Sequence, residues 1–263
     1  MTSPATDPIT VFVLSWGRPI YLWACLDAVH RATRSPCRVV LFDNAHPDPL
    51  VGDVIRGFER RGLFAEVIRS PTNSFDDFRA AYRERLEGLG SLHVYLESDC
   101  VILERDGCWL AEMRRVMEAH PGIAMLGSLI DPGDFVPRET ALGLSGGDAA
   151  AAEFLAKLGS PERGFGADPS WGATDRDHFP TRPPCPIGNP PGRLMMLRTG
   201  IMRELGFQLD AELARRVREL GFEAAVTPRV RHRHLSLLNI YDYADYDAIH
   251  RDAFFTAPPR GAV

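Results

Sequence analysis

The chain has 263 residues, of which 45% are hydrophobic and 25% are charged, with a formal net charge of −5. These proportions are typical of a globular protein, and the acidic balance argues against a broad nucleic-acid-binding surface. Of the 30 basic residues only Lys157 is a lysine. It follows no glycine-rich loop, so the sequence has no Walker-type phosphate-binding motif, and it is a poor candidate for a Schiff-base lysine.

The five cysteines are widely spaced and form no CxxC pair. This spacing argues against a disulfide framework or a zinc ribbon and favours a reducing compartment. The N-terminal segment has no basic stretch followed by an apolar run, and no window reaches eighteen apolar residues. We therefore expect a cytoplasmic protein with neither a signal peptide nor a transmembrane segment.

The first half of the chain alternates strand-like and helix-like segments. Continuous apolar runs predict strands at 9–16, 37–44, 64–71, 92–99 and 123–130. Between them, apolar residues at helical spacing predict helices that begin near Pro19, cover 50–62, run from Phe75 to Leu86 and include Trp109 to Met117. This alternation is typical of a parallel sheet with helices on both faces.

The second half is less regular. Residues 159–193 are rich in glycine and proline and predict a long loop. Beyond it the pattern predicts a strand within 193–200, a short helix to Gly206, a helix over 209–220, a strand over 223–235 and an aromatic, acidic tail. We expect a single α/β domain with a mostly parallel central sheet, a long Gly/Pro-rich loop and a C-terminal extension.

Polar side chains stand where the predicted strands end. They are Ser15, Asp43 and Asn44, the segment 71–73, and Glu97 to Asp99. Ligands of open α/β sheets bind beyond the carboxyl ends of the strands. These residues therefore mark the predicted binding site.

Glu97 and Asp99 are the most informative pair. Two residues apart on an extended strand, they point to the same side. Neighbouring carboxylates repel each other unless a cation or a proton lies between them. Mg²⁺ or Mn²⁺ takes one or two carboxylates together with phosphate oxygens. The pair predicts a divalent-cation site; the alternative is a strand end that meets solvent.

In their order along the chain, these segments resemble the GT-A-fold nucleotide-sugar glycosyltransferases, in particular the inverting family 2 of bacterial enzymes. VFVLSWGRPIYLWACLDAV is similar to the opening strand, turn and helix of that family, and VVLFDNAHPD to its second strand and acidic end. VYLESDC stands in place of the DxD-type motif, and LDAELARRVRELGF resembles the segment E-D-x-D-L-x-x-R-x-x-x-x-G-[FY]. The resemblance covers 9–130 and 188–235. It departs at Glu97 and Leu209, where the family has aspartate and an acidic residue.

The resemblance implies a transferase that moves a sugar from a UDP- or GDP-sugar donor to a hydroxyl group of a small molecule or glycan, with inversion and with Mg²⁺ or Mn²⁺. Residues 1–130 would then bind the donor, 131–235 the acceptor, and 236–263 would form a tail. The candidate donor-binding residues are Ser15, Trp16, Arg18, Asp43, Asn73, Arg79, Glu97, Ser98, Asp99 and Arg193.

The resemblance also assigns catalytic and further metal-binding candidates. Asp210 matches the general base, with Glu212 in reserve, although an aspartate before an apolar helix is also a good N-cap. In the last strand, His232 and His234 alternate with arginines and share one face. Neutral imidazole is a common metal ligand, so either histidine is a candidate ligand beside Glu97 and Asp99.

Two other functions stay open at this point. A non-catalytic relative that binds a carbohydrate or a nucleotide is motivated by Leu209, which replaces an acid of the family segment. A sugar-1-phosphate nucleotidylyltransferase is disfavoured because the turn after the first strand is short and contains no lysine.

Overall fold

The computed structural model describes residues 7–45, 47–104, 107–130, 178–180, 193–208 and 210–235. The predicted loop at 159–193 lies outside these residues except for 178–180 and Arg193, and the tail 236–263 lies outside them entirely. Among the described residues, no helix combines the length and the apolar character needed to cross a bilayer.

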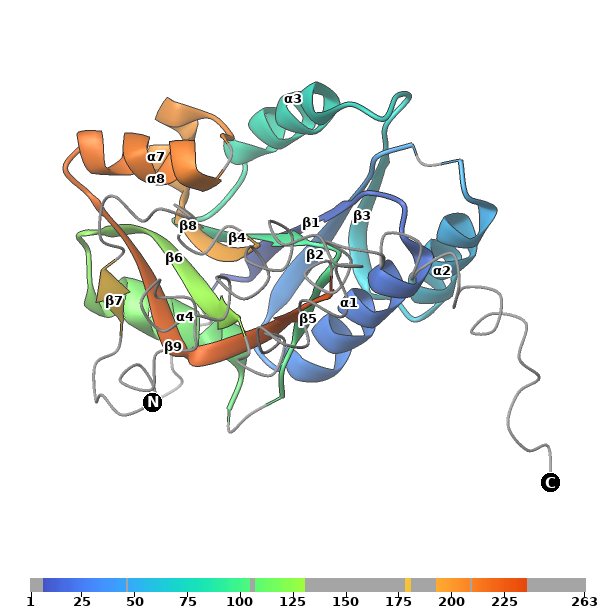
Figure 1. Cartoon of the computed structure of the whole chain (residues 1–263), viewed down its shortest axis with the longest axis horizontal. Coiled ribbons are helices and arrows are strands. Elements are labelled where there is room, and N and C mark those ends of the chain that lie inside the picture. Colours follow the sequence, from blue (N-terminus) through green and yellow to red (C-terminus); the bar gives the residue numbers. More distant parts are fainter. Residues whose placement is uncertain are drawn as a thin grey trace, which may run out of the picture.

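One twisted sheet organises the described part of the chain (Figure 1). Its strands follow the order β3-β2-β1-β4-β8-β6-β9-β5, and β7 pairs with β9. Six of the nine strands run in one direction, whereas β5, β7 and β8 run against it. The bounds are β1 Ile9–Ser15, β2 Cys37–Asp43, β3 Phe64–Arg69, β4 Leu92–Glu97, β5 Cys100–Ile102, β6 Ile123–Ile130, β7 Phe179–Pro180, β8 Leu194–Arg198 and β9 Glu223–His234.

Helices cover both faces of this sheet (Figure 1). One core cluster joins one face to α1 (Pro19–Ala32), α2 (Pro49–Arg60) and α4 (Trp109–Ala119). The other joins the opposite face to α3 (Phe75–Leu86), α7 (Thr199–Leu205) and α8 (Asp210–Glu219). In β1, Val11 and Val13 belong to the first cluster, and Phe12 and Leu14 to the second. Apolar residues on both strand faces are what a sheet buried between two helical layers requires.

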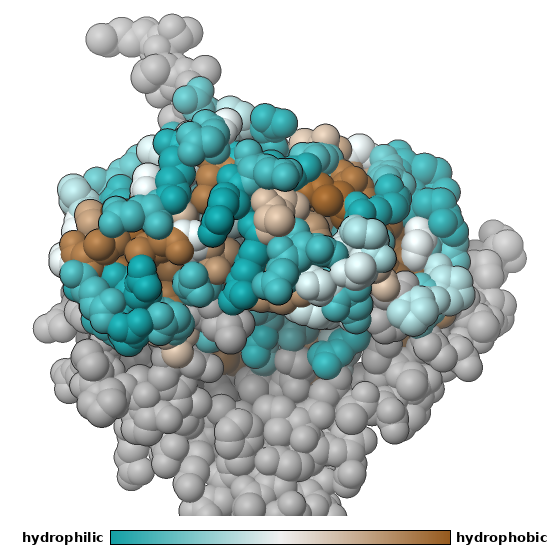
Figure 2. All heavy atoms as spheres, turned by 90° about the horizontal axis from the view of Figure 1, so that it is seen from above, coloured by the Kyte–Doolittle hydropathy of each residue, from teal (hydrophilic) through white to brown (hydrophobic). Residues whose placement is uncertain are grey.

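The outward surfaces of the helices are polar. Viewed from above, the described residues present a mostly hydrophilic surface with separate hydrophobic patches (Figure 2). On α8, Leu213, Ala214 and Val217 are buried, while Arg215 ion-pairs with Glu212 on the exposed side. The helical spacing of apolar residues therefore predicts correctly that Leu213 and Val217 pack on the sheet, but the expected burial of Leu220 is wrong, since Leu220 is 37% exposed.

The predicted single α/β domain with a mostly parallel sheet is confirmed, and the strand at 123–130 has the predicted bounds. The extended strand predicted over 92–99 is wrong at its end. β4 stops at Glu97, Ser98 and Asp99 form a turn, and β5 begins at Cys100. The Ser98 N–H donates to the Leu14 carbonyl at 3.0 Å. This long-range bond fixes the turn, and the local apolar pattern does not reveal it.

Candidate functional site

The carboxyl ends of the neighbouring strands β1, β2 and β4 lie side by side along the edge of the sheet at which the parallel strands end. Ser15 pairs with Asp43 in the parallel ladder, and Leu14 pairs with Glu97 on the other side. The Asn44 N–H donates to the Ser15 carbonyl at 3.2 Å, which continues the alignment beyond the strands. The predicted convergence of the polar strand ends is therefore present in the structure.

A glycine lets the chain leave β1 at this edge. Gly17 has φ of 78°, a conformation that residues with a Cβ rarely adopt, and its N–H donates to Ser15 Oγ at 3.4 Å. Arg18 follows in extended conformation as the N-cap of α1, and Pro19 is the first helical residue. The sequence Gly-Arg-Pro thus turns the chain sharply from strand to helix.

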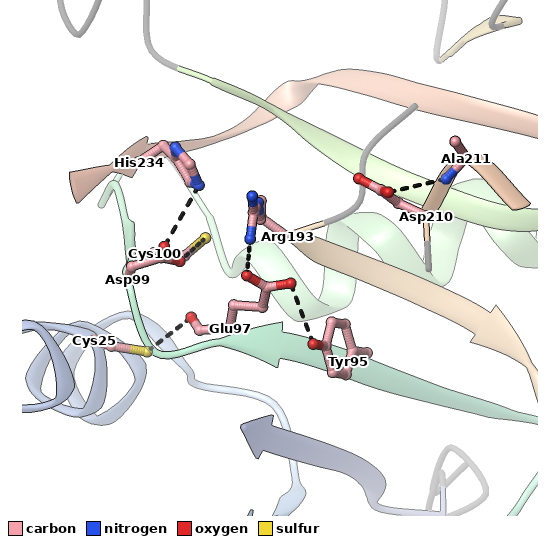
Figure 3. A network of polar contacts seen from close by, with 9 residues as sticks. All are labelled: Cys25, Tyr95, Glu97, Asp99, Cys100, Arg193, Asp210, Ala211 and His234. Atoms are coloured by element: carbon pink, nitrogen blue, oxygen red, sulfur yellow. Dashed lines mark hydrogen bonds and ion pairs between the residues drawn. The ribbon is translucent and has the colours of Figure 1, made fainter. Parts of the chain in front are cut away.

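Asp99 and His234 come together where the turn after β4 meets the end of β9. Asp99 Oδ2 lies 3.6 Å from His234 Nε2 (Figure 3). Their side chains are only 12% and 5% exposed. The Leu235 N–H donates to the Asp99 carbonyl at 2.8 Å, and Cys100 pairs with His234 in the β5–β9 ladder. Residues 135 positions apart in the sequence thus place a carboxylate beside an imidazole.

The Glu97 carboxylate has other partners. Arg193 donates to Oε2, and the Tyr95 hydroxyl donates to Oε1 at 3.2 Å (Figure 3). Burial raises the pKa of Glu97 to about 7, against the opposing effect of the Arg193 guanidinium. Glu97 therefore titrates near neutral pH, with both of its oxygens engaged by neighbouring side chains.

His232 lies on the same strand as His234, with ring centroids 6.4 Å apart. It is 2% exposed, and its Nδ1 is hydrogen-bonded to Ser128 Oγ at 2.7 Å. Burial lowers the pKa of His232 to about 3, so the ring is neutral at physiological pH. Its Nε2 is buried and has no hydrogen-bond partner among the described residues. A buried nitrogen of this kind is a candidate for contact with a ligand.

The donor set suits a divalent cation bound together with a substrate. Asp99 and His234 supply one carboxylate and one imidazole, but the described residues contain no cluster of three or more His, Cys, Asp or Glu side chains placed to hold a metal. The remaining ligands would have to be phosphate oxygens and water, as is usual for Mg²⁺ sites. An imidazole in the set favours Mn²⁺ over Mg²⁺, because Mg²⁺ takes oxygen ligands.

A stacked aromatic pair, Trp16 and Phe75, lies beside Ser15. Trp16 is 38% exposed and stacks on Phe75, with centroids 6.0 Å apart and planes 15° apart. Arg79 lies over the same phenyl ring at 4.8 Å and ion-pairs with Asp76 at 3.1 Å. The partly exposed indole of Trp16 and the guanidinium of Arg79 therefore both pack against Phe75.

The other candidate donor-binding residues contact side chains or backbone groups close by in space. Asn73 Oδ1 accepts from Asn44 Nδ2 at 2.8 Å, and Arg18 lies 5.5 Å from the centroid of the Tyr21 ring. The Asp43 carbonyl accepts from the Ser70 N–H at 2.9 Å, which anchors the segment after β3.

Asp210 and Glu212 both belong to the first turn of α8. Asp210 Oδ1 accepts from the Ala211 N–H at 2.9 Å, and in Figure 3 no dashed line joins it to the Glu97 network. Glu212 accepts from Arg215 at 2.6 and 2.8 Å, and this interaction lowers the pKa of Glu212. Glu212 is thus tied to a surface ion pair, whereas the hydrogen bond of Asp210 is to its neighbour's backbone.

Comparison with known proteins places the fold. No family model and no curated protein matches the sequence. Among solved structures, the chain is similar to a mannosyltransferase from Pyrobaculum calidifontis in complex with GDP-Man and Mn²⁺, with TM-score 0.56, 15% identity and coverage of 88% of this chain and 58% of that one. The protein has a GT-A-like fold.

Two further structures share this GT-A-like fold. GalNAc-T7 with UDP, GalNAc and Mn²⁺ matches with TM-score 0.54 and 14% identity over 95% of this chain and 52% of that one. S. aureus TarS 1-349 with UDP-GlcNAc matches with TM-score 0.53 and 14% identity over 87% of this chain and 60% of that one. The chain therefore spans less than two thirds of each of these three structures.

Several side chains of the candidate site were not predicted from the sequence. Tyr95 contacts Glu97, Ser128 contacts His232, and Cys100 contacts Asp99. Tyr95 could have been found, since it lies two residues before Glu97 on the same face of β4. Ser128 and His232 come from distant strands whose parallel pairing no local pattern reveals.

Proposed function

We propose that the protein is a glycosyltransferase that moves a sugar from a nucleoside-diphosphate donor to a hydroxyl acceptor with inversion, using a divalent cation. The observation that carries the proposal is the buried pair of Asp99 and His234 at the carboxyl end of β4, within a GT-A-like fold. A carboxylate and an imidazole at this position can bind a divalent cation that is also bound by the diphosphate of the donor.

In this proposal Asp99 and His234 hold the ion, with Glu97 and His232 beside them. The His234 imidazole binds through a neutral nitrogen, and the Asp99 carboxylate contributes the negative charge. When bound, the ion stabilises the charge that develops on the departing nucleoside diphosphate. Ser98 helps to position Asp99, because Ser98 is buried and the hydrogen bond from its N–H to the Leu14 carbonyl holds the turn in place.

The donor lies along the edge formed by β1, β2 and β4. Asp43 contacts the nucleoside, and Trp16 offers a flat apolar face to it, with Asn73 nearby. Ser15 is 0% exposed and supports the adjacent turn by accepting from the Gly17 N–H. Arg18, Arg79 and Arg193 supply positive charge for the phosphates. Arg193 is the best placed of the three, since it contacts Glu97 beside Asp99.

Asp210 removes the proton of the acceptor hydroxyl as that oxygen attacks the anomeric carbon. One carboxylate base suits direct displacement from the opposite face, which gives inversion. Asp210 is preferred to Glu212, because the carboxylate of Glu212 is engaged by Arg215.

The first test is nucleotide binding by the full chain. Calorimetric titration with UDP and with GDP is carried out with and without Mn²⁺. We expect binding of at least one nucleotide, strengthened by Mn²⁺, and its loss in Asp99→Asn. Asp53→Asn is the matched control, since it makes the same chemical change in an exposed ion pair on α2. A wild type that binds neither nucleotide under any condition refutes the proposal.

The second test separates catalysis from binding. Asp210→Asn is expected to retain nucleotide binding but to lose about a hundredfold or more of the transfer rate, as is usual when a general base is removed. Glu219→Gln on the same helix should leave both unchanged. Donor binding without turnover in the wild type, on a panel of hydroxyl acceptors, would favour the non-catalytic relative instead.

A further inference from the structure

Two buried thiols contact the segment Glu97–Asp99, and the proposed function gives them no role. Cys25 in α1 and Cys100 in β5 are both 0% exposed. The Cys25 thiol donates to the Glu97 carbonyl at 3.7 Å, and the Cys100 thiol donates to Asp99 Oδ1 at 3.8 Å (Figure 3). One thiol therefore contacts the backbone of this segment, and the other contacts the carboxylate itself.

The two oxygens of the Asp99 carboxylate face different neighbours. Its Oδ1 faces the Cys100 thiol, and its Oδ2 faces His234 Nε2 at 3.6 Å. The backbone is fixed as well, because the Asp99 carbonyl accepts from the Leu235 N–H. With Oδ1 accepting from the Cys100 thiol, the other oxygen, Oδ2, is the one that faces the imidazole.

We propose that Cys100 is a positioning residue for the divalent cation, whose thiol holds Asp99 in the orientation in which Asp99 and His234 bind the ion together. This inference rests on the proposed function, which assigns the ion to that pair. Groups that hydrogen-bond to a metal ligand orient it and commonly change metal affinity about tenfold or more when they are removed. The thiol is a weak donor, but here it is shielded from competing water.

Cys25 provides a matched control inside the same molecule. It is the same residue type, it is equally buried, and it belongs to the same core cluster as Cys100. Its thiol donates to a backbone carbonyl, that of Glu97, whereas the thiol of Cys100 donates to the side chain of Asp99. Cys25→Ala and Cys100→Ala therefore remove the same atom from the core, and the second removes the hydrogen bond to the proposed metal ligand.

The test measures Mn²⁺ binding directly, by the electron paramagnetic resonance signal of free Mn²⁺, in titrations with MnCl₂ in the presence of UDP or of GDP. Cys100→Ala is expected to weaken Mn²⁺ binding about tenfold. Cys100→Ser, which keeps a donor, should recover most of the affinity, and Cys25→Ala should match the wild type. Thermal unfolding of each variant reports the separate cost in stability. Cys100→Val, which removes the donor and fills the space, replaces the alanine variant if that one does not fold.

The possible results lead to different conclusions. Wild-type affinity in Cys100→Ala or Cys100→Val overturns the positioning role and leaves the proposed function standing. Equal losses in Cys100→Ala and Cys25→Ala also overturn it, since they point to core packing alone. A wild type that binds no Mn²⁺ with either nucleotide overturns the inference together with the metal site on which it rests.

Discussion

His93 makes the stability of this protein depend on pH in a way that a single substitution can isolate. The ring is fully buried in β4, where Nε2 contacts the Tyr82 hydroxyl and Nδ1 is 2.9 Å from Thr199 Oγ1. Burial, with a smaller contribution from the charge of Arg203, lowers the pKa of His93 from 6.5 to about 3. The native protein therefore keeps this ring neutral at pH values where the unfolded chain protonates it.

The sign and the size of this pH effect follow from the linkage between proton binding at His93 and unfolding. Below pH 6.5 the unfolded state binds more protons at His93 than the native state does, so stability falls as the pH falls towards 3. Each pH unit in this window costs about 1.4 kcal/mol, so lowering the pH from 7 to 5 removes about 2 kcal/mol through His93. His232, with its similarly lowered pKa, acts in the same direction, so the wild-type slope contains more than one contribution.

The assay compares urea unfolding, followed by circular dichroism, at pH 7, 6 and 5. His93→Gln cannot titrate, so the variant should lose about 2 kcal/mol less between pH 7 and pH 5 than the wild type, whatever its stability at pH 7. His30→Gln, the same substitution at an exposed position of α1, is the control for the change of side chain itself. A His93→Gln variant with an unchanged slope would refute the reasoning.

Two further predictions concern the chemistry and the helices outside the candidate site. Cys108 Sγ accepts from the backbone N–H groups of Arg34 and Ser35 at 3.2 and 3.4 Å. Burial raises the pKa of Cys108, but such hydrogen bonds together outweigh it and leave the pKa lowered, whereas burial raises the pKa of Cys37. Iodoacetamide at pH 7 should therefore label Cys108 faster than Cys37, as followed by peptide mass spectrometry; faster labelling of Cys37 would contradict this. Ser74 caps α3 by accepting from the Asp76 N–H at 3.1 Å, so Ser74→Ala should cost about 1 kcal/mol in urea unfolding, with Ser74→Asn close to the wild type. Equal stability of the alanine variant and the wild type would show that the cap contributes nothing.

Much of the architecture was predictable from local pattern. The runs ITVFVLS and IAMLGSLI are strands because apolar residues on both faces suit a sheet covered by two helical layers. The helix from Phe75 to Leu86 follows from buried residues at helical spacing, Phe78, Tyr82 and Leu86, after a serine cap. The meeting of Ser15, Asp43 and Glu97 at one edge follows in turn, because parallel strands end on the same side of a sheet.

The tertiary structure alone decided how the distant segments join this edge. β8 enters between β4 and β6 and runs against both, which brings Arg193 to Glu97. The end of β9 pairs with β5 and delivers His234 to Asp99. Strand neighbours and directions depend on packing between residues far apart in the chain, and an apolar strand carries the same local signal in either direction. For this reason the sequence shows which side chains could bind a donor and an ion, while the order of strands in the sheet determines which of them meet.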